Sequence, residues 1–586
     1  MTLVWSCFWF VASLLTMALL VHGQPGFLSI DCGIPDGLNY TDDTTQMVYT
    51  SDAKYIDTGI NQEISAATYM TQTDVPRQYR NLRSFPDGTR NCYTLTPVNK
   101  SSRYLLRASF MYGDYDGLNK PPQFDVYVGV NLWYVNLPST GDGYWRNEII
   151  FYATTDYISV CLVNIGHGIP YISTLELRLL DNSIYQAANE SQLLQLYNRN
   201  HFRPSGRIRF PDDAYDRIWY PWGENPWTLI NTSSPINLKE DNGYQPPLSV
   251  MNTAVTPSKS SENFSFNFPT SNLNKSFQYQ IFMHFAELEL LRSNEFRQFN
   301  IFIDGVFAHG PFSLVYLSAD TIFIYSALNG LNRHVIDFRK TTTSTLPPIL
   351  NAVETYILQP LSARPTDSRD VDAIMNIKTR YNIRRNWMGD PCLPASFLWE
   401  GLNCNCTHSK PPTIISLDLS SSGLTGEVSP LLSNLTSLQL LDVSNNRLTG
   451  PVPNFLTELT SLKFLNLSNN NLTGTIPTVL QERSNNGSLS LSIDNNPHLV
   501  GSSIVPVNDN ILPCQGGSCK KRRMTVVHIV APVILALIML IVMVYVFRRI
   551  NQRRRHRGAL AGSNTGFFTD DNGRKYPTDL ESLNPI

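Results

Sequence analysis

A short loop combines aromatic and acidic side chains in a pattern suited to sugar binding. The candidate residues are Tyr112, Asp114, Tyr115 and Asp116, which two glycines flank. Aromatic faces stack on sugar C–H surfaces, and carboxylates accept hydrogen bonds from sugar hydroxyls. Asp and Gly also build ordinary turns. The loop therefore carries two hypotheses, a carbohydrate-binding site and a turn that belongs to the scaffold.

A second candidate surface comes from three units that repeat with a period of 24 residues and start at Ile414, Leu438 and Leu462. Successive side chains of a strand point to opposite faces. Leu441 and Leu465 are therefore predicted to be buried, with polar neighbours on the open face. The candidate ligand-binding residues there are Asp442, Asn445, Phe464 and Asn469. A glycan on Asn466 would obstruct this face, so a spacer or a lateral contact is the alternative.

The sequence offers little support for catalysis. Glu287 and Glu289 are expected to share one side of a strand as solvated carboxylates, and nothing else converges on them as a glycosidase pair would require. His167 and His284 have no partner at metal-ligand spacing. The residues after 547 contain none of the kinase motifs. We therefore expect no enzyme activity, no cofactor and no metal site.

Two apolar segments predict the topology. Residues 525–547 form an apolar run whose length, at about 1.5 Å per residue, spans a hydrocarbon core of roughly 30 Å. Residues 1–23 are predicted to be a cleaved signal peptide, and 548–586 a short cytoplasmic tail that begins with an arginine cluster. These features predict a single-pass protein of the plasma membrane with its N-terminus outside the cell.

Charge and modification patterns agree with an extracellular position. The residues before the apolar run carry a net charge of −10 once Lys520–Arg523 are set aside, which argues against nucleic-acid binding. Eight of the nine cysteines lie between the signal peptide and this run, which favours disulfides. All the Asn-X-Ser/Thr sites also precede it: Asn39, Asn99, Asn189, Asn231, Asn263, Asn274, Asn405, Asn434, Asn466, Asn471 and Asn486.

Residues 24–365 are rich in aromatic side chains and in short alternating segments. Residues 124–128 and 299–303 are typical of strands with one buried face. The region also repeats internally, because aligning Phe110 with Phe285 and Glu176 with Glu354 superimposes the surrounding motifs. The pattern predicts two tandem β-sandwiches that meet around residues 183–203.

Five spaced motifs in this region resemble those of the malectin-like domain of plant receptor kinases: Ser29-Ile30-Asp31-Cys32-Gly33, Tyr55-Ile56-Asp57-Thr58-Gly59, Thr89-Arg90-Asn91-Cys92-Tyr93, Tyr215-Asp216-Arg217-Ile218-Trp219 and His284-Phe285-Ala286-Glu287-Leu288. The related animal malectin is a single sandwich that binds a glucose disaccharide through loop aromatics and an acidic residue. The resemblance therefore implies carbohydrate binding, although plant members frequently lack those loop residues.

Residues 366–519 contain the repeating units, which resemble the plant-type leucine-rich repeat. The resemblance implies a ladder of buried asparagines at Asn446 and Asn470, with a departure at Ser422 in the first unit. The ends of such a stack need covering, so Cys392 is expected to pair with Cys404 or Cys406, and Cys514 with Cys519. The connectivity of Cys32, Cys92, Cys161 and the remaining cap cysteine stays open.

The expected fold is mainly β: tandem malectin-like sandwiches, then a short repeat solenoid and one transmembrane helix. The expected function is that of a cell-surface receptor-like protein whose kinase domain is absent. It would bind an extracellular ligand, a carbohydrate or a peptide, or a partner ectodomain, and signal through a partner receptor kinase. The alternatives are a decoy or truncated isoform that sequesters ligand, and a tether to wall polysaccharide.

Overall fold

The computed structural model describes residues 26–65, 75–133, 135, 137, 143–202, 206–222, 227–238, 243–258, 263–269, 278–328, 333–407, 410–500, 568–569 and 575–576. The chain divides into two compact units, Met1–Ile504 and Val505–Ile586. In the second unit the described residues form β35 (Phe568–Thr569) and β36 (Lys575–Tyr576), which pair antiparallel.

Several predictions from the two ends fall outside this described part: the signal peptide, the apolar run at 525–547, most of the tail, and Cys514 with Cys519. Within the described ranges, no helix has both the length and the apolar character needed to span a bilayer.

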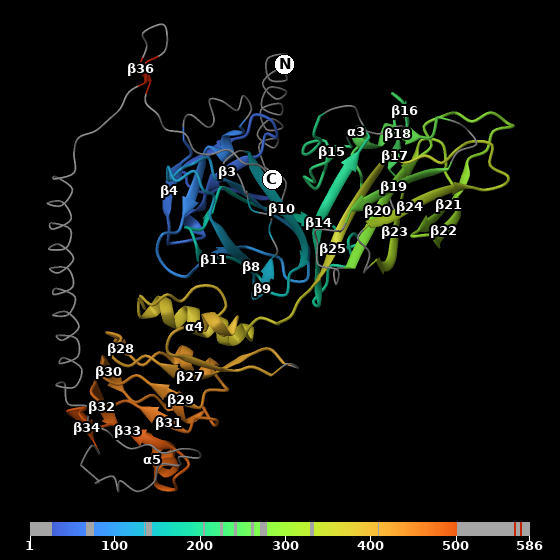
Figure 1. Cartoon of the computed structure of the whole chain (residues 1–586). Helices are drawn as coiled ribbons and strands as arrows, with labels where there is room; N and C mark the ends of the chain where they lie inside the picture. Colours follow the sequence, from blue (N-terminus) through green and yellow to red (C-terminus); the bar gives the residue numbers. More distant parts are fainter. Residues whose placement is uncertain are drawn as a thin grey trace, which may run out of the picture. The chain divides into compact units, whose positions relative to one another are not determined.

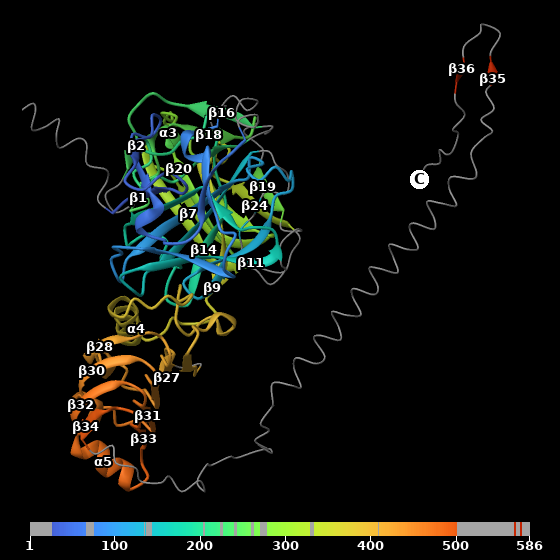
Figure 2. The same cartoon turned by 90° about the vertical axis from the view of Figure 1, so that its left-hand side faces the viewer.

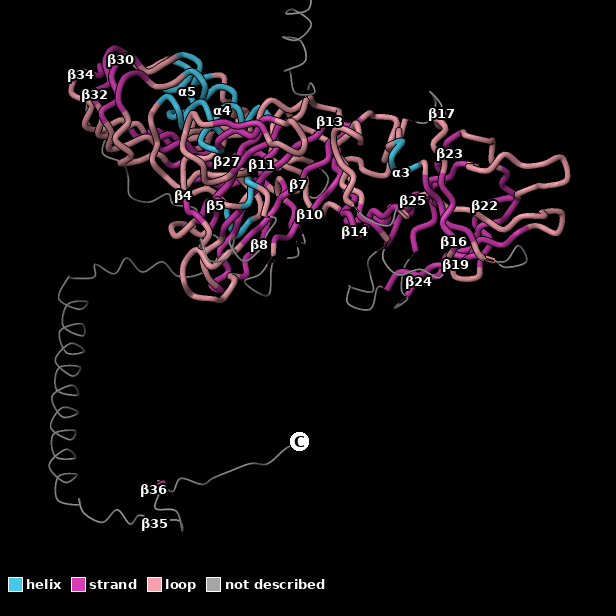
Figure 3. The backbone as a smooth tube through the Cα atoms, turned by 90° about the horizontal axis from the view of Figure 1, so that it is seen from above, coloured by secondary structure: helices cyan, strands magenta, loops and turns pink. Residues whose placement is uncertain are grey.

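One large sheet runs through the part of the first unit that precedes the repeats (Figure 1). Its strands follow the order β17 (Asn237–Leu238), β23 (Ser318–Leu328), β20 (Gln278–Ala286), β25 (Ala352–Pro360), β14 (Gln192–His201), β10 (Tyr144–Tyr152), β7 (Arg103–Met111), β13 (Thr174–Leu180), β1 (Leu28–Asp31), β3 (Val48–Ser51) and β2 (Asn39–Thr41), with β15 (Tyr220–Pro221) beside β14. Strands are the main regular element of the described backbone, as Figure 3 shows.

Two four-stranded sheets belong to the two sandwiches. The first contains β6 (Arg90–Leu95), β11 (Ile158–His167), β8 (Gln123–Val128) and β9 (Asn131–Trp133), and the second β19 (Phe264–Pro269), β24 (Arg333–Lys340), β21 (Gln298–Ile303) and β22 (Val306–Ser313). Smaller elements are β4 (Ile60–Glu63), β5 (Asn81–Ser84), β12 (Tyr171–Ile172), β16 (Thr228–Asn231), β18 (Thr253–Thr256), η1 (Asp52–Lys54), η2 (Arg77–Tyr79) and α3 (Leu248–Met251).

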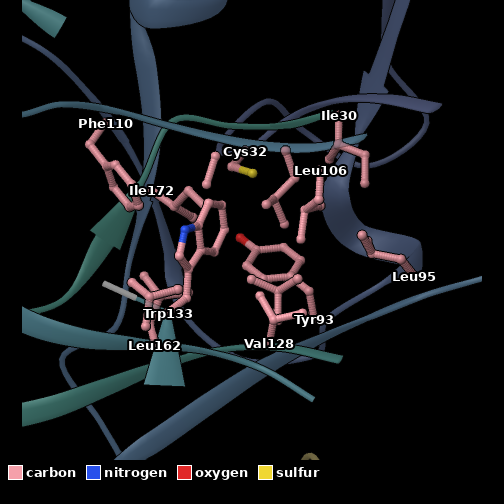
Figure 4. Close-up of a cluster of buried hydrophobic side chains, with 14 of the residues drawn as sticks. Ile30, Cys32, Tyr93, Leu95, Leu106, Phe110, Val128, Trp133, Leu162 and Ile172 are labelled. Atoms are coloured by element: carbon pink, nitrogen blue, oxygen red, sulfur yellow. The ribbon is translucent and has the colours of Figure 1, made fainter. Parts of the chain in front are cut away.

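Alternating burial explains why these segments form strands. In β8 the inward side chains are Phe124, Val126 and Val128, and β21 has the same pattern, as the sequence predicted. They pack into separate cores, one in each sandwich. Figure 4 shows part of the first core, where Tyr93 and Trp133 lie among aliphatic side chains and the buried thiol of Cys32.

The internal repeat corresponds to equivalent strands, since the aligned positions place β7 on β20, β8 on β21 and β13 on β25. The join differs from a simple meeting of two sandwiches. Residues 192–201 form β14, which pairs with β10 on one side and with β25 on the other. The two sandwiches therefore share one continuous sheet, because the connecting segment is itself a strand.

The region after residue 366 is a solenoid (Figure 2). A cap is formed by α4 (Ser368–Arg380), η3 (Ala395–Phe397) and β26 (Leu402–Asn405), and β27 (Thr413–Asp418), β29 (Leu440–Asp442), β31 (Phe464–Asn466) and β33 (Ser490–Ser492) follow as a parallel ladder. The opposite side carries β28 (Thr425–Glu427), β30 (Arg447–Pro451), β32 (Asn471–Thr475), β34 (His498–Val500), η4 (Pro430–Asn434), η5 (Asn454–Thr457) and α5 (Thr478–Asn485).

The predicted asparagine ladder is present between the turns of the solenoid. The Asn446 side chain donates to the carbonyl oxygen of Leu419 at 2.9 Å and accepts from the backbone N–H of Leu424 at 3.0 Å. Asn470 donates to the carbonyl oxygen of Val443 at 3.0 Å and accepts from the Leu448 N–H at 3.0 Å. These bonds satisfy backbone groups that the parallel strands leave unpaired.

The register of the repeats predicts unequal effects of neighbouring substitutions. Leu465 is 0% exposed, so Leu465→Ala should lower the free energy of unfolding by about 2–5 kcal/mol through lost burial and a cavity. Lys463 is exposed, so Lys463→Ala should change it by less than about 0.5 kcal/mol. Urea unfolding followed by circular dichroism checks both, and equal losses would contradict this register.

Candidate functional site

The loop after β7 does not present Tyr112 as a free aromatic face. Tyr112 is 0% exposed, and its hydroxyl donates to Asp116. Asp114 accepts the Asn119 N–H at 2.7 Å, so the carboxylates close the loop on itself. Tyr115 is partly buried against the same core. The predicted stacking role of Tyr112 therefore has no accessible ring in this structure, and sugar binding by Asp114, Tyr115 or Asp116 remains a prediction.

The predicted repeat surface is assembled as one face of the ladder. Asp442 and Phe464 are half-buried on neighbouring strands, and Asn445 and Asn469 are exposed just beyond the strand ends. The Asn466 amide donates to Asp442 at 3.0 Å, which ties adjacent repeats together. Because Asn466 lies on this face, a glycan there would stand beside Asp442. Ligand binding at these four positions remains a prediction.

The structure gives two of the cysteine pairings and the exposure of most of the sequon asparagines. The structure pairs Cys392 with Cys404 at the repeat cap and Cys92 with Cys161 between β6 and β11, while Cys32 is a buried and Cys406 an exposed thiol. Asn274 lies outside the described residues, and Asn189 and Asn466 are half-buried. The exposed sequon asparagines are Asn39, Asn99, Asn231, Asn263, Asn405, Asn434, Asn471 and Asn486.

A row of buried charges crosses the shared sheet, and sequence reasoning did not find it. We call it the ionic strip: Glu176, Arg107, Glu148, Arg199 and Glu354 on strands β13, β7, β10, β14 and β25. The successive ion pairs measure 2.6, 2.9, 2.7 and 2.7 Å. All five side chains are at most 4% exposed. Arg199 thus joins a carboxylate of the first sandwich to one of the second.

A crossing segment, residues 209–217, lies against this strip. Asp216 accepts hydrogen bonds from Arg178 and Arg209, each at 2.8 Å. Arg217 pairs with Asp213 at 2.9 Å, and Asp213 also accepts the indole N–H of Trp219 at 2.7 Å. The motif Tyr215–Trp219 therefore supplies charges to the interior and not to an external ligand site.

The ion pairs of the strip determine the ionisation of its carboxylates and of the neighbouring His284. Burial alone would raise the pKa of Glu176 and Glu354, but the surrounding guanidinium groups outweigh it and hold both pKa values well below the usual range. Burial lowers the pKa of His284, so its contact with Glu354 at 3.1 Å is a hydrogen bond donated by a neutral imidazole. The carboxylates are stable acceptors and offer no proton for catalysis.

Glu287 departs from the sequence-based expectation in a similar way. It is buried and pairs with Arg297 at 2.7 Å, and Arg297 also contacts Glu289 at 2.5 Å. Glu287 is therefore not a solvated carboxylate as expected, because it follows β20 directly and lies beside the buried guanidinium of Arg297. Its charge is used to hold the loop before β21.

Removing one member of the ionic strip should be costly. Arg199→Ala leaves Glu148 and Glu354 without their common partner and should lower the free energy of unfolding by about 3–5 kcal/mol. A matched control is Arg369→Ala, because the Arg369–Asp367 pair is 3.3 Å long and Arg369 is 72% exposed; it should lose less than about 1 kcal/mol. Thermal and urea unfolding measure both, and comparable losses would show that the strip does not stabilise the fold.

Asp31 is a buried carboxyl with a different environment. Its Oδ2 accepts the Tyr40 hydroxyl at 2.7 Å, and its Oδ1 has no hydrogen-bond partner. Burial, aided by the nearby charge of Asp52, raises the pKa of Asp31 to about 7. The folded protein therefore keeps a proton here between about pH 4 and 7 that the unfolded chain releases, so this group's stabilisation falls as pH rises through that window.

The substitution Asp31→Asn isolates this effect because it removes the titration and keeps an acceptor for Tyr40. Relative to wild type, the variant should gain stability as pH rises, on the order of 1 kcal/mol per pH unit between pH 5 and 7. Melting curves of both proteins across pH 5 to 8 measure the difference. A difference that does not change with pH would show that Asp31 is already ionised at pH 5.

Arg90 holds the first sandwich against the repeat cap, and the Cys92–Cys161 disulfide of the sandwich packs against Gly389 of the cap. The Arg90 guanidinium donates to the carbonyl oxygens of Asp390 at 3.1 Å and Leu393 at 3.2 Å, and also to that of Met388. Gly389 has φ +64°, and an added Cβ would lie 2.9 Å from the Cys92 sulfur. Only glycine fits here without displacement, so the two parts approach each other closely at Gly389.

Comparisons with known proteins agree with this two-part architecture. Residues 30–358 match the Malectin-like domain family, and residues 437–459 and 461–482 match the Leucine Rich Repeat family. A probable LRR receptor-like serine/threonine-protein kinase of Arabidopsis thaliana is 43% identical over 432 residues, which cover 72% of this chain and 49% of that protein. The LRR receptor-like serine/threonine-protein kinase IOS1 of the same plant is 39% identical over 446 residues, 74% of this chain and 48% of IOS1.

The chain thus spans about half the length of the curated relatives it matches. Among solved structures, the ANX1 ectodomain of Arabidopsis thaliana matches with a TM-score of 0.47 and 18% identity, over 57% of this chain and 96% of that one.

Proposed function

The chain belongs to the malectin-like family of plant receptor-like proteins with leucine-rich repeats, and from that premise we propose that it recognises an extracellular ligand or partner ectodomain at the plasma membrane. After binding, the protein signals through a partner receptor kinase. The described residues act in this role by binding and not by catalysis.

One observation carries the proposal. The chain matches the Malectin-like domain family and then the Leucine Rich Repeat family, and a relative named as a probable LRR receptor-like kinase is 43% identical over 432 residues. The Arg90 contacts support it, because a junction fixed by three backbone carbonyls lets one ligand contact both parts at once.

The test is recovery of a kinase partner from the cell surface. The full chain, tagged and expressed in plant cells, should be crosslinked outside intact cells and purified, and a receptor kinase should be enriched in the purified complex. The matched control carries the same tag and the same residues from 505 onward, joined to an unrelated ectodomain. Recovery of wall glycans without a kinase, together with resistance to detergent extraction, would contradict the receptor role and favour a wall tether.

A further inference from the structure

A cavity of about 630 Å³ lies at the Arg90 junction. Its walls come from residues 53–57 around η1, from β6, from the loop before β11, and from α4 with the following tryptophan segment. This volume is within the range of about 300–1,000 Å³ that is usual for ligand pockets, and such pockets are common where two domains meet.

The walls of the cavity are held in place by contacts that need no ligand. Trp387 and Trp399 stack with ring centroids 5.1 Å apart, and the Lys378 ammonium donates to the Trp387 carbonyl at 2.8 Å. Arg90 anchors the segment between these two tryptophans. The cavity is therefore preformed, which lowers the entropic cost of binding.

Aromatic and thioether side chains line the interior. Tyr55, Tyr157 and Met388 are half-buried, and Met375 on α4 is 38% exposed. Burial raises the pKa of both tyrosines, so their rings stay neutral. Neutral aromatic faces attract apolar groups and also cations, which lie over the ring.

Two carboxylates approach the cavity from opposite walls. Asp156 belongs to the sandwich loop before β11, and Asp372 belongs to α4. Partial burial raises the pKa of Asp372, and the negative charge of Asp156 raises it further, so the two groups repel each other. In the described part of the chain neither side chain takes part in a hydrogen bond or an ion pair.

The other charged groups on the cavity walls do not neutralise Asp156 and Asp372. Asp57 adds a third carboxylate, the Lys378 ammonium is engaged by Trp387, and Lys54 is an exposed ammonium on the rim. A cation placed between Asp156 and Asp372 would relieve the repulsion. The described residues hold no group of three or more His, Cys, Asp or Glu side chains that could bind a metal ion, which favours an organic cation.

We propose that this junction cavity binds a basic peptide segment, with an Arg or Lys side chain between Asp156 and Asp372 and an adjacent apolar residue against Tyr157 and Met375. The proposal rests on the receptor function above and names its ligand class. The net charge of −10 on the part of the chain before the basic cluster at 520–523 would steer such a ligand toward the protein. A bound peptide would contact the sandwich and the repeat cap together.

The test uses the purified full chain and two probe peptides, acetyl-Phe-Arg-Phe-amide and acetyl-Phe-Glu-Phe-amide, in isothermal titration calorimetry. The Arg peptide should bind, with an affinity that falls as ionic strength rises, and the Glu peptide should not. In the double variant Asp156→Asn with Asp372→Asn, the Kd of the Arg peptide should rise about tenfold or more. The absence of Arg-peptide binding to the wild type would overturn the proposal.

A matched control removes the same charge elsewhere. Asp43→Asn with Glu458→Gln changes two exposed carboxylates that do not line the cavity, and it should leave the Kd unchanged. If the Asn double variant does not fold, Met375→Lys provides a second test, because it places a positive charge in the cavity and should weaken binding of the Arg peptide. An unchanged Kd in either cavity variant would overturn the site.

The two proposals fail in different ways. If the chain recovers a receptor kinase but binds neither probe, the ligand assignment is wrong and the receptor role stands. If the Arg peptide binds and the cavity variants weaken it, the site is supported whether or not a kinase is recovered.

Discussion

The fold depends on Arg199, which forms ion pairs with Glu148 and Glu354 inside the shared sheet. A buried guanidinium loses its hydration, and only close partners on several sides repay that loss. Here the partners come from β10 and β25, which belong to different sandwiches. The same contact that keeps the charge paired therefore keeps the two sandwiches in register.

The rest of the ionic strip extends this constraint in both directions. Opposite charges on neighbouring strands alternate from Glu176 to Glu354, so each buried charge is paired with one of opposite sign on the next strand. The equivalent positions Glu176 and Glu354 in the internal repeat both serve as ends of the strip. The motif residues that suggested a binding family thus act largely as internal supports.

Local patterns made much of the fold predictable. Alternation identified β8 and β21, the period of 24 residues identified the ladder at Leu441 and Leu465, and the capping argument left Cys392 with two candidate partners, of which Cys404 is the one used. The candidate site was less accessible to such reasoning. The same sequence of Tyr, Asp and Gly is compatible with a tyrosine ring that faces solvent or the core. In this structure the ring of Tyr112 faces the core.

The remaining features depend on contacts between residues far apart in the sequence. Arg199 and Glu354 are 155 residues apart, and Arg90 and Asp390 are 300 apart. Neither the periodicity nor the spacing of residues in the sequence predicts such pairings. The ionic strip and the junction cavity are therefore seen only in the three-dimensional structure.

The position of β14 also limits where the chain can be cut into separately folding fragments. Because β14 pairs with β10 and with β25, a boundary drawn anywhere within it leaves at least one long strand edge with unpaired backbone groups. Such edges favour association with other chains. The malectin-like part therefore forms one structural unit, and a fragment that kept a single sandwich of this chain would expose such an edge.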